Sequence, residues 1–514
     1  MLLGPCGAII PQRRARRNLL MALRLPSIQK GTQFAKAFWN DTSGIILPYV
    51  TMMLVVIVGL SVLALDGARL MSLQTQLQNG ADALALAGAA ELDRLPDAET
   101  RARTAIERLL TNSTRFGSGA NRTITVSNIQ FYRRLPASDA SPMSAATRAT
   151  GSRDARFVAV TVKPVTLSTI LPAAFFGGSN TITTARSAVA GFDQVVCGVT
   201  PMYVCNPYET AGMTYDQATE VLQHAAADPV DQGRLLILRQ YDANAPYAAA
   251  NYGFLDSPTL GHDELSLIES LAVVRPAACF MQRGVNFRPG FVRSVREGFN
   301  VRFDIYEGSM SERYNDSNYH PAQNVRKGYV VASGDDGNNN ACAARRGANW
   351  PIGSPPNQVT GLPLDQTWPH FERIGEGNWD FNTYWQVNHA APPPSDLTEG
   401  SARDVPSRYR VYRYEIQQGY FADVSAGGES GAPACYTGGN LPAAPDRRIL
   451  YAAIINCQSL RLDGEAQSNV PVAAFGKFFL TLPLARAQTD LYVEMVGLVR
   501  PGDGVSYDVV QLYR

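Results

Sequence analysis

The longest apolar segment of the chain runs from Gly44 to Leu65 and contains no charged residue. As a helix, its 22 residues would span about 33 Å, which is enough to cross a hydrocarbon layer of about 30 Å. Within lipid every backbone N–H and C=O group must be paired, and a helix pairs them inside one segment. The alternative is a helix buried in a soluble core, but such a helix is rarely apolar on every side over this length. We therefore expect a transmembrane helix.

The helical pattern continues past this segment without a stop signal. Leucines recur on one helix face, and alanines four residues apart form a second stripe of small side chains, which another helix or a sheet could approach closely. Pro96 ends the pattern, so the helix is expected from Ile45 to Arg94, about 75 Å long. A shorter amphipathic helix is expected over Asp97–Leu110. The residues expected to face partner helices are Leu70, Leu73, Leu77, Ala81, Leu84, Ala85 and Ala89.

The pattern then changes to alternation with a period of two, which is typical of β-strands. Strands are predicted at Thr123–Val126 with Ile129–Tyr132, Phe157–Val165 and Thr181–Ala190. Their Val and Thr content suits a half-buried sheet. The region 66–191 is thus expected to be a long helix whose outer half packs on a small β-sheet.

The region 192–514 is rich in Gly, Pro, Asn and Tyr and has few long helical patterns. Helices are predicted at Asp216–Ala225 and Asp263–Ala272, and loops at 332–363 and 388–408. The predicted strands are Leu235–Leu238, Arg410–Glu415, Arg448–Asn456, Phe478–Leu482 and Leu491–Val499. The whole chain is expected to have an α+β fold, with one N-terminal transmembrane helix and a β-rich, disulfide-containing extracytoplasmic domain.

The distribution of charge predicts the orientation in the membrane. The net charge of the 514 residues is only +1, which gives no reason to expect nucleic-acid binding. Before the apolar segment, the basic residues outnumber the single acidic residue, Asp41, whereas acidic residues predominate from Asp66 to Thr100. Basic residues stay on the cytoplasmic side. Residues 1–43 are therefore expected to form a cytoplasmic tail, whether translation starts at Met1 or at Met21, and the chain after Leu65 is expected to lie outside.

A cleaved secretory signal is the competing interpretation of the N-terminus. Its apolar core would normally be about 7–15 residues long, and the segment here is longer and ends without a clean small-x-small site. We expect an anchor that is not cleaved at such a site.

Cysteine placement agrees with an oxidising outer compartment. Cys6 lies on the expected inner side, and all the other cysteines lie on the outer side. An even set in an oxidising compartment indicates disulfides, and six cysteines allow 15 pairings. Proximity favours Cys197 with Cys205. The alternative, free thiols in a cytosolic protein, requires the membrane prediction to be wrong. The expected disulfide cysteines are Cys197, Cys205, Cys279, Cys342, Cys435 and Cys457.

Several stretches together resemble one known family. Gly44 precedes the apolar segment, the sequence DGAR follows it at Asp66–Arg69, and LQNGADALALAGA occupies Leu77–Ala89. This order resembles the N-terminal domain of TadG-like Flp (tight-adherence) pilus-assembly proteins, closely over Asp41–Glu91. The strand ending in Thr183–Ala190 is also similar to the family.

The resemblance implies a single-pass inner-membrane protein of a bacterial pilus system, with a periplasmic C-terminal region and a pilin-like helix packed on a small sheet. The implied partners are the lipid bilayer and other pilus-assembly or pilin-like proteins. Gly44 would be the processing site, but pilin-like relatives carry a Glu five residues later, where this chain has Tyr49. Tyr49 has no carboxylate, which favours a permanently anchored assembly factor over a minor pilin cut after Gly44.

Three short motifs are candidate sites of chemistry. Asp423–Gly427 is the nearest match to the Asp-x-Ser-x-Ser metal motif of von Willebrand A domains, which many TadG-like proteins carry, but its last Ser is missing. Asp335–Asn340 could offer oxygens to Ca²⁺, but it lacks the Glu that closes an EF-hand loop. Gly428–Pro433 resembles the loop around a protease serine, with Ser430 as nucleophile and His389 and Asp423 as conceivable partners. Surface loops and turns are the simpler interpretation of all three.

Histidines and aromatic residues add little specific chemistry. His224, His262, His320, His370 and His389 show no metal-binding spacing, and there is no P-loop or dinucleotide-binding motif. Several aromatic residues lie close together in the sequence and could form either a binding face or the core of a β-domain. They are Trp350, Trp368, Trp379, Tyr384 and Trp385. We expect no catalytic residue, cofactor, metal or small-molecule substrate.

The expected function is non-enzymatic: an anchored component of Flp pilus assembly that acts through protein–protein contacts. The alternatives are a minor pilin processed after Gly44, or a membrane-tethered periplasmic enzyme or ligand-binding protein.

Overall fold

The computed structural model describes residues 46–93, 96–109, 123–328 and 361–513. Short gaps within these ranges fall at 137, 139–140, 153, 171, 173, 175–176, 243–245, 258, 370–371, 400–402, 404, 423–429, 443–444, 465, 485–488 and 501. The predictions made for Gly44, Asp335–Asn340, Cys342 and Asp423–Gly427 lie outside the described residues.

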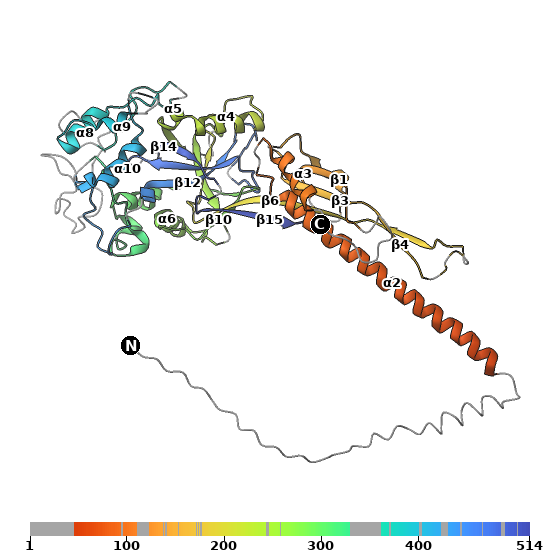
Figure 1. The fold of residues 1–514 in the computed structure, drawn as a ribbon. Helices are drawn as coiled ribbons and strands as arrows, with labels where there is room; N and C mark the ends of the chain where they lie inside the picture. The colour runs from red at the N-terminus through yellow and green to blue at the C-terminus, as the bar shows by residue number, and fades with distance from the viewer. Residues whose placement is uncertain are drawn as a thin grey trace, which may run out of the picture. The chain divides into compact units, whose positions relative to one another are not determined.

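The chain forms two compact units, coloured along the sequence in Figure 1. The first comprises Met1–Gly80, Thr111–Thr125 and Val162–Arg186, and the second comprises Ala81–Leu110, Val126–Thr161 and Ser187–Arg514. Helix α2 (Ile46–Ala89) begins in the first unit and ends in the second. Its 44 residues confirm the long helix expected from the sequence, which ends at Ala89 rather than at Arg94.

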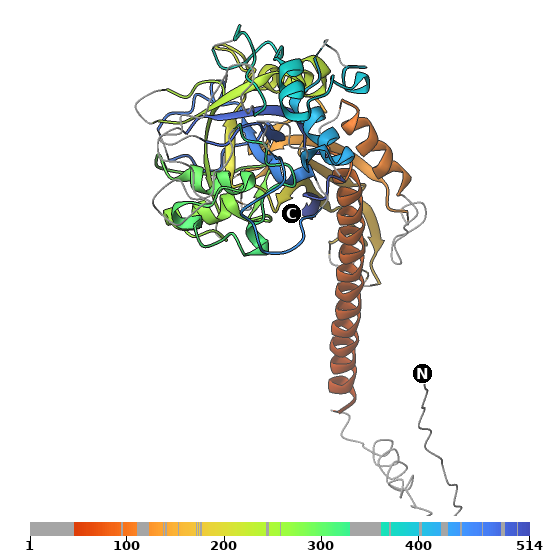
Figure 2. The ribbon, with the colours of Figure 1, turned by 90° about the vertical axis from the view of Figure 1, so that its left-hand side faces the viewer.

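In the first unit, α2 is accompanied by a hairpin of β4 (Val165–Ser168) and β5 (Thr181–Thr184), as Figure 2 shows. Leu73 and Leu77 of the helix are fully buried. Gly80 allows close packing, because a Cβ at this position would lie 2.7 Å from the Cδ1 atom of Ile124. The helix therefore tolerates the conformational cost of a glycine, about 1 kcal/mol, at the point where a neighbouring side chain needs the space.

The second unit begins with the end of α2, followed by α3 (Ala98–Arg108), whose Ala98, Ala102 and Ile106 are buried. A first sheet has the strand order β10 (Cys279–Met281), β6 (Ser187–Cys197), β3 (Phe157–Val162), β1 (Val126–Arg134) and β2 (Thr147–Arg148). The last strand of the chain, β15 (Ser506–Leu512), also pairs with β6. The expected boundary between residues 191 and 192 therefore falls inside β6, within a pairing that runs from Ala190 to Val196.

A second sheet makes up most of the rest of this unit. Its order is β11 (Asn286–Arg288), β9 (Asn251–Asp256), β7 (Met202–Cys205), β12 (Ile449–Ile455), β13 (Ala474–Leu480), β14 (Leu491–Leu498) and β8 (Leu235–Gln240). Because β8 also pairs with β9, all of these strands except β11 form a closed ring of neighbours.

Helices surround this sheet (Figure 1). They are α4 (Tyr215–Ala227), α5 (Pro229–Gln232), α6 (Glu264–Ala272), α7 (Val295–Asn300), α8 (Phe381–His389), α9 (Ser395–Thr398) and α10 (Arg408–Gln418). Single 3-10 turns lie at Met143–Ala145, Val301–Phe303, Gly308–Met310, Ser317–Tyr319, Tyr420–Ala422 and Pro445–Arg448. One core cluster joins strand residues such as Ile454 and Val493 to Leu222 of α4 and Phe299 of α7. The α+β fold expected from the sequence is confirmed.

The strand predicted at Arg410–Glu415 is wrong, because these residues lie in α10. The alternation that suggested a strand is overridden by helix signals at both ends: the Ser407 side chain accepts a hydrogen bond from the Arg410 N–H, and Gly419 ends the helix in the left-handed conformation. The buried positions, Arg408, Val411, Tyr412 and Glu415, follow the helical spacing. Two of them are charged, and Arg408 is paired with Asp365 at 2.6 Å and with Glu494 at 2.9 Å.

The pairing of Cys197 with Cys205 is also wrong. Cys197 is bonded to Cys279, its register partner on the neighbouring strand β10, and Cys205 is bonded to Cys457, which follows β12 beside β7. The two cysteines belong to different sheets, so each is bonded to a cysteine on or just after a neighbouring strand of its own sheet, despite their closeness in sequence. Cys435 is also disulfide-bonded, so the expectation of disulfides is confirmed for five of the predicted cysteines.

Candidate functional site

The N-terminal part of α2 exposes apolar side chains on all sides. The large hydrophobic residues exposed between Ile46 and Leu65 keep 43% to 69% of their surface accessible, and none of the best 18-residue window is buried. Among the described residues, α2 is the one helix long and apolar enough to cross a membrane. Its properties fit a single-pass membrane anchor.

The exposed segment ends at a polar contact. Asp66 directly follows Leu65 and is buried, and both of its carboxylate oxygens accept the N–H of Ile170 at 2.9 Å. Arg69, one helical turn further on, pairs with Asp66 at 3.1 Å and donates to the backbone oxygen of Ser168 at 3.2 Å. The DGAR sequence thus fixes the β4–β5 hairpin to α2 where the apolar segment stops. We call this set of contacts the Asp66 clasp.

The leucine and alanine face predicted for partner helices is used inside the chain itself. Leu70 is half-buried, and the other six residues, Leu73, Leu77, Ala81, Leu84, Ala85 and Ala89, expose at most 3% of their surface. In the second unit, a Cβ on Gly88 would lie 2.6 Å from Ile106 of α3 and 3.4 Å from Val158 of β3. The small residues therefore let this chain's own helix and sheet approach α2.

A cleft in the described part of the second unit is lined by several arginines. Its volume is about 700 Å³, and Arg133, Arg134, Arg156 and Arg283 line it together with Tyr215 and Tyr513. No acidic residue belongs to this lining. Arg133 and Arg134 end strand β1 and are exposed, and the Arg133 guanidinium lies 5.8 Å from the centre of the Tyr215 ring. We call this surface the arginine cleft.

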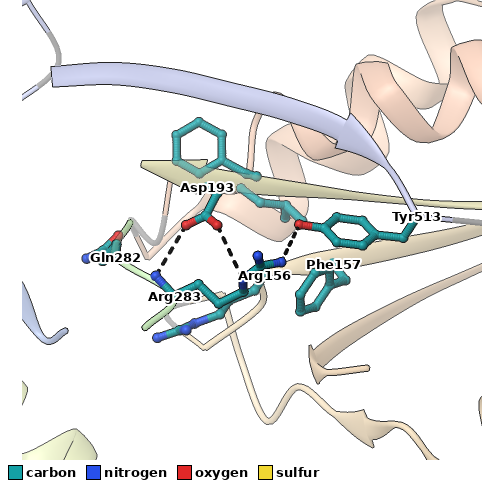
Figure 3. Close-up of a pocket in the computed structure, with 8 residues that line it drawn as sticks. Arg156, Phe157, Asp193, Gln282, Arg283 and Tyr513 are labelled. Atoms are coloured by element: carbon teal, nitrogen blue, oxygen red, sulfur yellow. Dashed lines mark hydrogen bonds and ion pairs between the residues drawn. The ribbon is translucent and has the colours of Figure 1, made fainter. Parts of the chain in front are cut away.

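Asp193 holds Arg283 in place in a smaller pocket, which shares Arg283 and Tyr513 with the arginine cleft (Figure 3). The Asp193 carboxylate accepts the backbone N–H of Arg283 at 3.3 Å and lies 3.6 Å from its Nε atom. The same guanidinium donates to the Tyr513 hydroxyl at 3.0 Å. Burial raises the pKa of Asp193, and the charges of Arg283 and Arg156 oppose this increase. A cavity of about 10 Å³ beside these residues has room for about one water molecule.

Gly191 makes room for the aromatic wall of the cleft. A Cβ at this position would lie 2.5 Å from the Phe157 ring and 2.8 Å from the Tyr513 ring. These two rings meet edge to face, with their centres 5.1 Å apart. Sequence reasoning missed the cleft because its residues come from separate segments that only the two sheets and the C-terminal strand bring together.

The other predicted sites of chemistry are occupied by structural contacts. The Ser430 hydroxyl accepts the N–H of Ala432, as in a turn, and His389 is hydrogen-bonded to the buried carboxylate of Glu415 at 2.9 Å. Trp379, Tyr384 and Trp385 belong to a hydrophobic core, so the core interpretation holds for these aromatic residues. His224 and His262 are exposed and His320 is half-buried. No group of three His, Cys, Asp or Glu side chains that could hold a metal occurs in the described part of the chain.

Comparison with known protein families gives a match at the N-terminal part of the chain. Residues 44–91 match the family model described as "Putative Flp pilus-assembly TadE/G-like". No curated protein and no solved structure matches the chain. The matched segment contains the exposed apolar part of α2, the DGAR sequence of the Asp66 clasp and the buried leucine and alanine face. The chain therefore carries an N-terminal TadE/G-like Flp pilus-assembly domain over residues 44–91.

Proposed function

We propose that this protein is a non-enzymatic, single-pass inner-membrane component of Flp pilus assembly that acts through contacts with other pilus-assembly or pilin-like proteins. The observation that carries the proposal is the change of environment along α2. The helix is apolar and exposed up to Leu65, and from Asp66 onward its residues enter a folded structure. One continuous helix is therefore both the membrane anchor and part of the fold of the exported region.

Charge and disulfides support the orientation. The basic residues before Gly44 favour a cytoplasmic N-terminus, since such residues stay inside. The Cys197–Cys279 and Cys205–Cys457 disulfides fit an oxidising compartment such as the periplasm. Both arguments point to the same side of the membrane for the region after Leu65.

We place the contact with a partner protein at the arginine cleft. The leucine and alanine face of α2 is buried, whereas Arg133 and Arg134 expose positive charge beside the cleft. Arginine binds carboxylates in a planar, bidentate geometry and stacks on aromatic rings, so the matching surface would carry Asp or Glu side chains. Such a contact strengthens association by long-range attraction and weakens as salt rises.

The test is a charge-reversal pair with a matched control, made in the full-length protein in cells that otherwise lack it. The cleft variant carries Arg133→Glu and Arg134→Glu. The control carries Arg275→Glu and Arg413→Glu, which are also exposed and lie outside the cleft lining. The readouts are pilus formation and recovery of pilus-assembly proteins with the tagged protein after crosslinking.

We expect the cleft variant to lose both readouts at normal abundance and the control to keep them. Normal pili and normal recovery with the cleft variant would contradict the contact site. If the protein is recovered in sheared pili with Ile45 as its first residue, it is a minor pilin cut after Gly44 and not a permanently anchored assembly factor.

A further inference from the structure

The β4–β5 hairpin is held at the edge of the apolar segment of α2. The Ile170 N–H is bonded to Asp66, the residue that directly follows the exposed Leu65. Ile170 is itself apolar and exposed: 53% of its surface is accessible, close to the 56% of Leu65. An exposed isoleucine at the level where a membrane-spanning helix leaves the hydrocarbon is in the position of a lipid contact.

The direction of β4 follows from its two contacts with α2. Ser168 accepts from Arg69, and Ile170, two residues later, donates to Asp66. As the chain advances from Ser168 to Ile170, its partner on the helix moves back by three residues towards the N-terminus. Strand β4 therefore runs towards the apolar end of α2, and its following loop starts at the predicted membrane surface. Figure 2 shows the hairpin beside the helix on this side.

The composition of the hairpin suits contact with lipid. No charged residue occurs between Lys163 and Arg186, and the sequence between Thr169 and Gly177 reads ILPAAFF. Exposed apolar groups without charge are unfavourable in water, and those beside a transmembrane helix are stabilised in the interfacial region of the bilayer.

We propose that Ile170, just after the β4 arm of the hairpin, is a second membrane contact whose side chain inserts into the outer leaflet next to α2. The occupant of this surface is the lipid bilayer, because the hairpin is continuous with the anchor through the Asp66 clasp and shares its apolar, uncharged character. The inference rests on the proposed function only in that α2 has to span the membrane.

The experiment uses the full-length protein in native membranes, with a photoreactive phenylalanine derivative at one position at a time. The three positions are Leu63 in the apolar segment, Ile170 at the hairpin, and Leu265 of α6, a control with a similarly exposed hydrophobic side chain. After illumination, lipid adducts on the protein are measured by mass spectrometry. Disulfide formation, checked on a non-reducing gel, shows that each variant is folded.

We expect lipid adducts at 63 and 170 to exceed those at 265 by about tenfold or more, since only positions inside the bilayer or at its surface contact lipid. Adducts at 63 but only the level of 265 at position 170 would overturn the hairpin contact and leave the anchor standing. The absence of adducts at 63 would overturn the anchor and the hairpin contact together. If position 170 forms adducts with a water-soluble molecule in the outer solution as often as with lipid, insertion would also be contradicted.

Discussion

Both carboxylate oxygens of Asp66 lie 2.9 Å from the backbone nitrogen of Ile170, which is 104 residues further along the chain. This contact closes the hairpin onto the helix one residue after the apolar segment ends. A buried carboxylate needs hydrogen bonds to compensate for lost hydration, and Asp66 obtains them from Ile170 and Arg69. The first polar residue after the apolar segment is thus also the residue that fixes the next part of the fold.

The first prediction concerns this contact. Asp66→Asn keeps the size of the side chain but removes the charge and one of the two acceptor oxygens. We expect faster hydrogen exchange at the Ile170 amide and a loss of about 1–3 kcal/mol of local stability, as for other hydrogen bonds to charged groups. The matched control is Glu107→Gln, an exposed acid on α3. Unchanged protection of the Ile170 amide in Asp66→Asn would contradict the role of the clasp.

The second prediction compares two glycines of the same helix. A Cβ on Gly88 would meet Ile106 at 2.6 Å, whereas a Cβ on Gly67 meets nothing within 4 Å. Gly88→Ala is expected to lower the free energy of unfolding by about 1–3 kcal/mol through overpacking, whereas Gly67→Ala should raise it by up to about 1 kcal/mol through helix propensity. Thermal unfolding of both variants in the same detergent measures the difference. Equal effects of the two substitutions would show that α2 does not pack closely at Gly88.

The third prediction concerns disulfide pairing. Peptide mapping without reduction should recover a Cys197–Cys279 pair and a Cys205–Cys457 pair. Replacing both Cys205 and Cys457 by Ala should cost about 2–5 kcal/mol, because this disulfide closes a long segment of chain. A recovered peptide that links Cys197 to Cys205 would contradict the strand arrangement around β6 and β7.

The fourth prediction concerns the pH dependence that comes from Asp193. Its folded pKa is raised above 3.8 by burial, so the folded state holds the proton more tightly than the unfolded state. Its contribution to stability is therefore fully present below 3.8 and is lost as pH rises through the folded pKa. Asp193→Asn cannot titrate at this position. Across that window, the free energy of unfolding should fall less steeply for Asp193→Asn than for the parent chain, as measured by urea unfolding at several pH values. Parallel curves would contradict the raised pKa.

The sequence predicts the parts of the fold that depend on local pattern. The long helix, α3 and the strands near Phe157 and Arg448 follow from periodicity, since buried apolar residues there recur with regular spacing. Helix α10 was missed because half of its buried face consists of Arg408 and Glu415, whose partners lie far away in the sequence. Strand β15 was also missed, because its residues are largely exposed and its pairing with β6 joins distant parts of the chain.

The candidate sites differ in the same way. The apolar segment and the DGAR sequence are contiguous, so the anchor could be recognised from the sequence and its resemblance to a family. The sequence predicts a partner contact for Leu77, because an amphipathic pattern shows that a helix face is covered. The pattern does not show whether another protein or this chain covers that face, and in the structure Leu77 is buried. The arginine cleft depends on Arg133, Arg156 and Arg283, which only tertiary structure brings together. No local signal in the sequence marks that set of residues.

The central claim is that α2 crosses the membrane up to Leu65 and that the region from Asp66 onward lies on the outer side. Its most direct test is protease digestion of intact spheroplasts that contain the full-length protein with a C-terminal tag, beside a cytoplasmic control protein. We expect loss of the tag, with a small N-terminal fragment retained in the membrane and the control protein intact. A tagged chain that survives until the membrane is broken, or that is recovered in the soluble fraction, would contradict the claim.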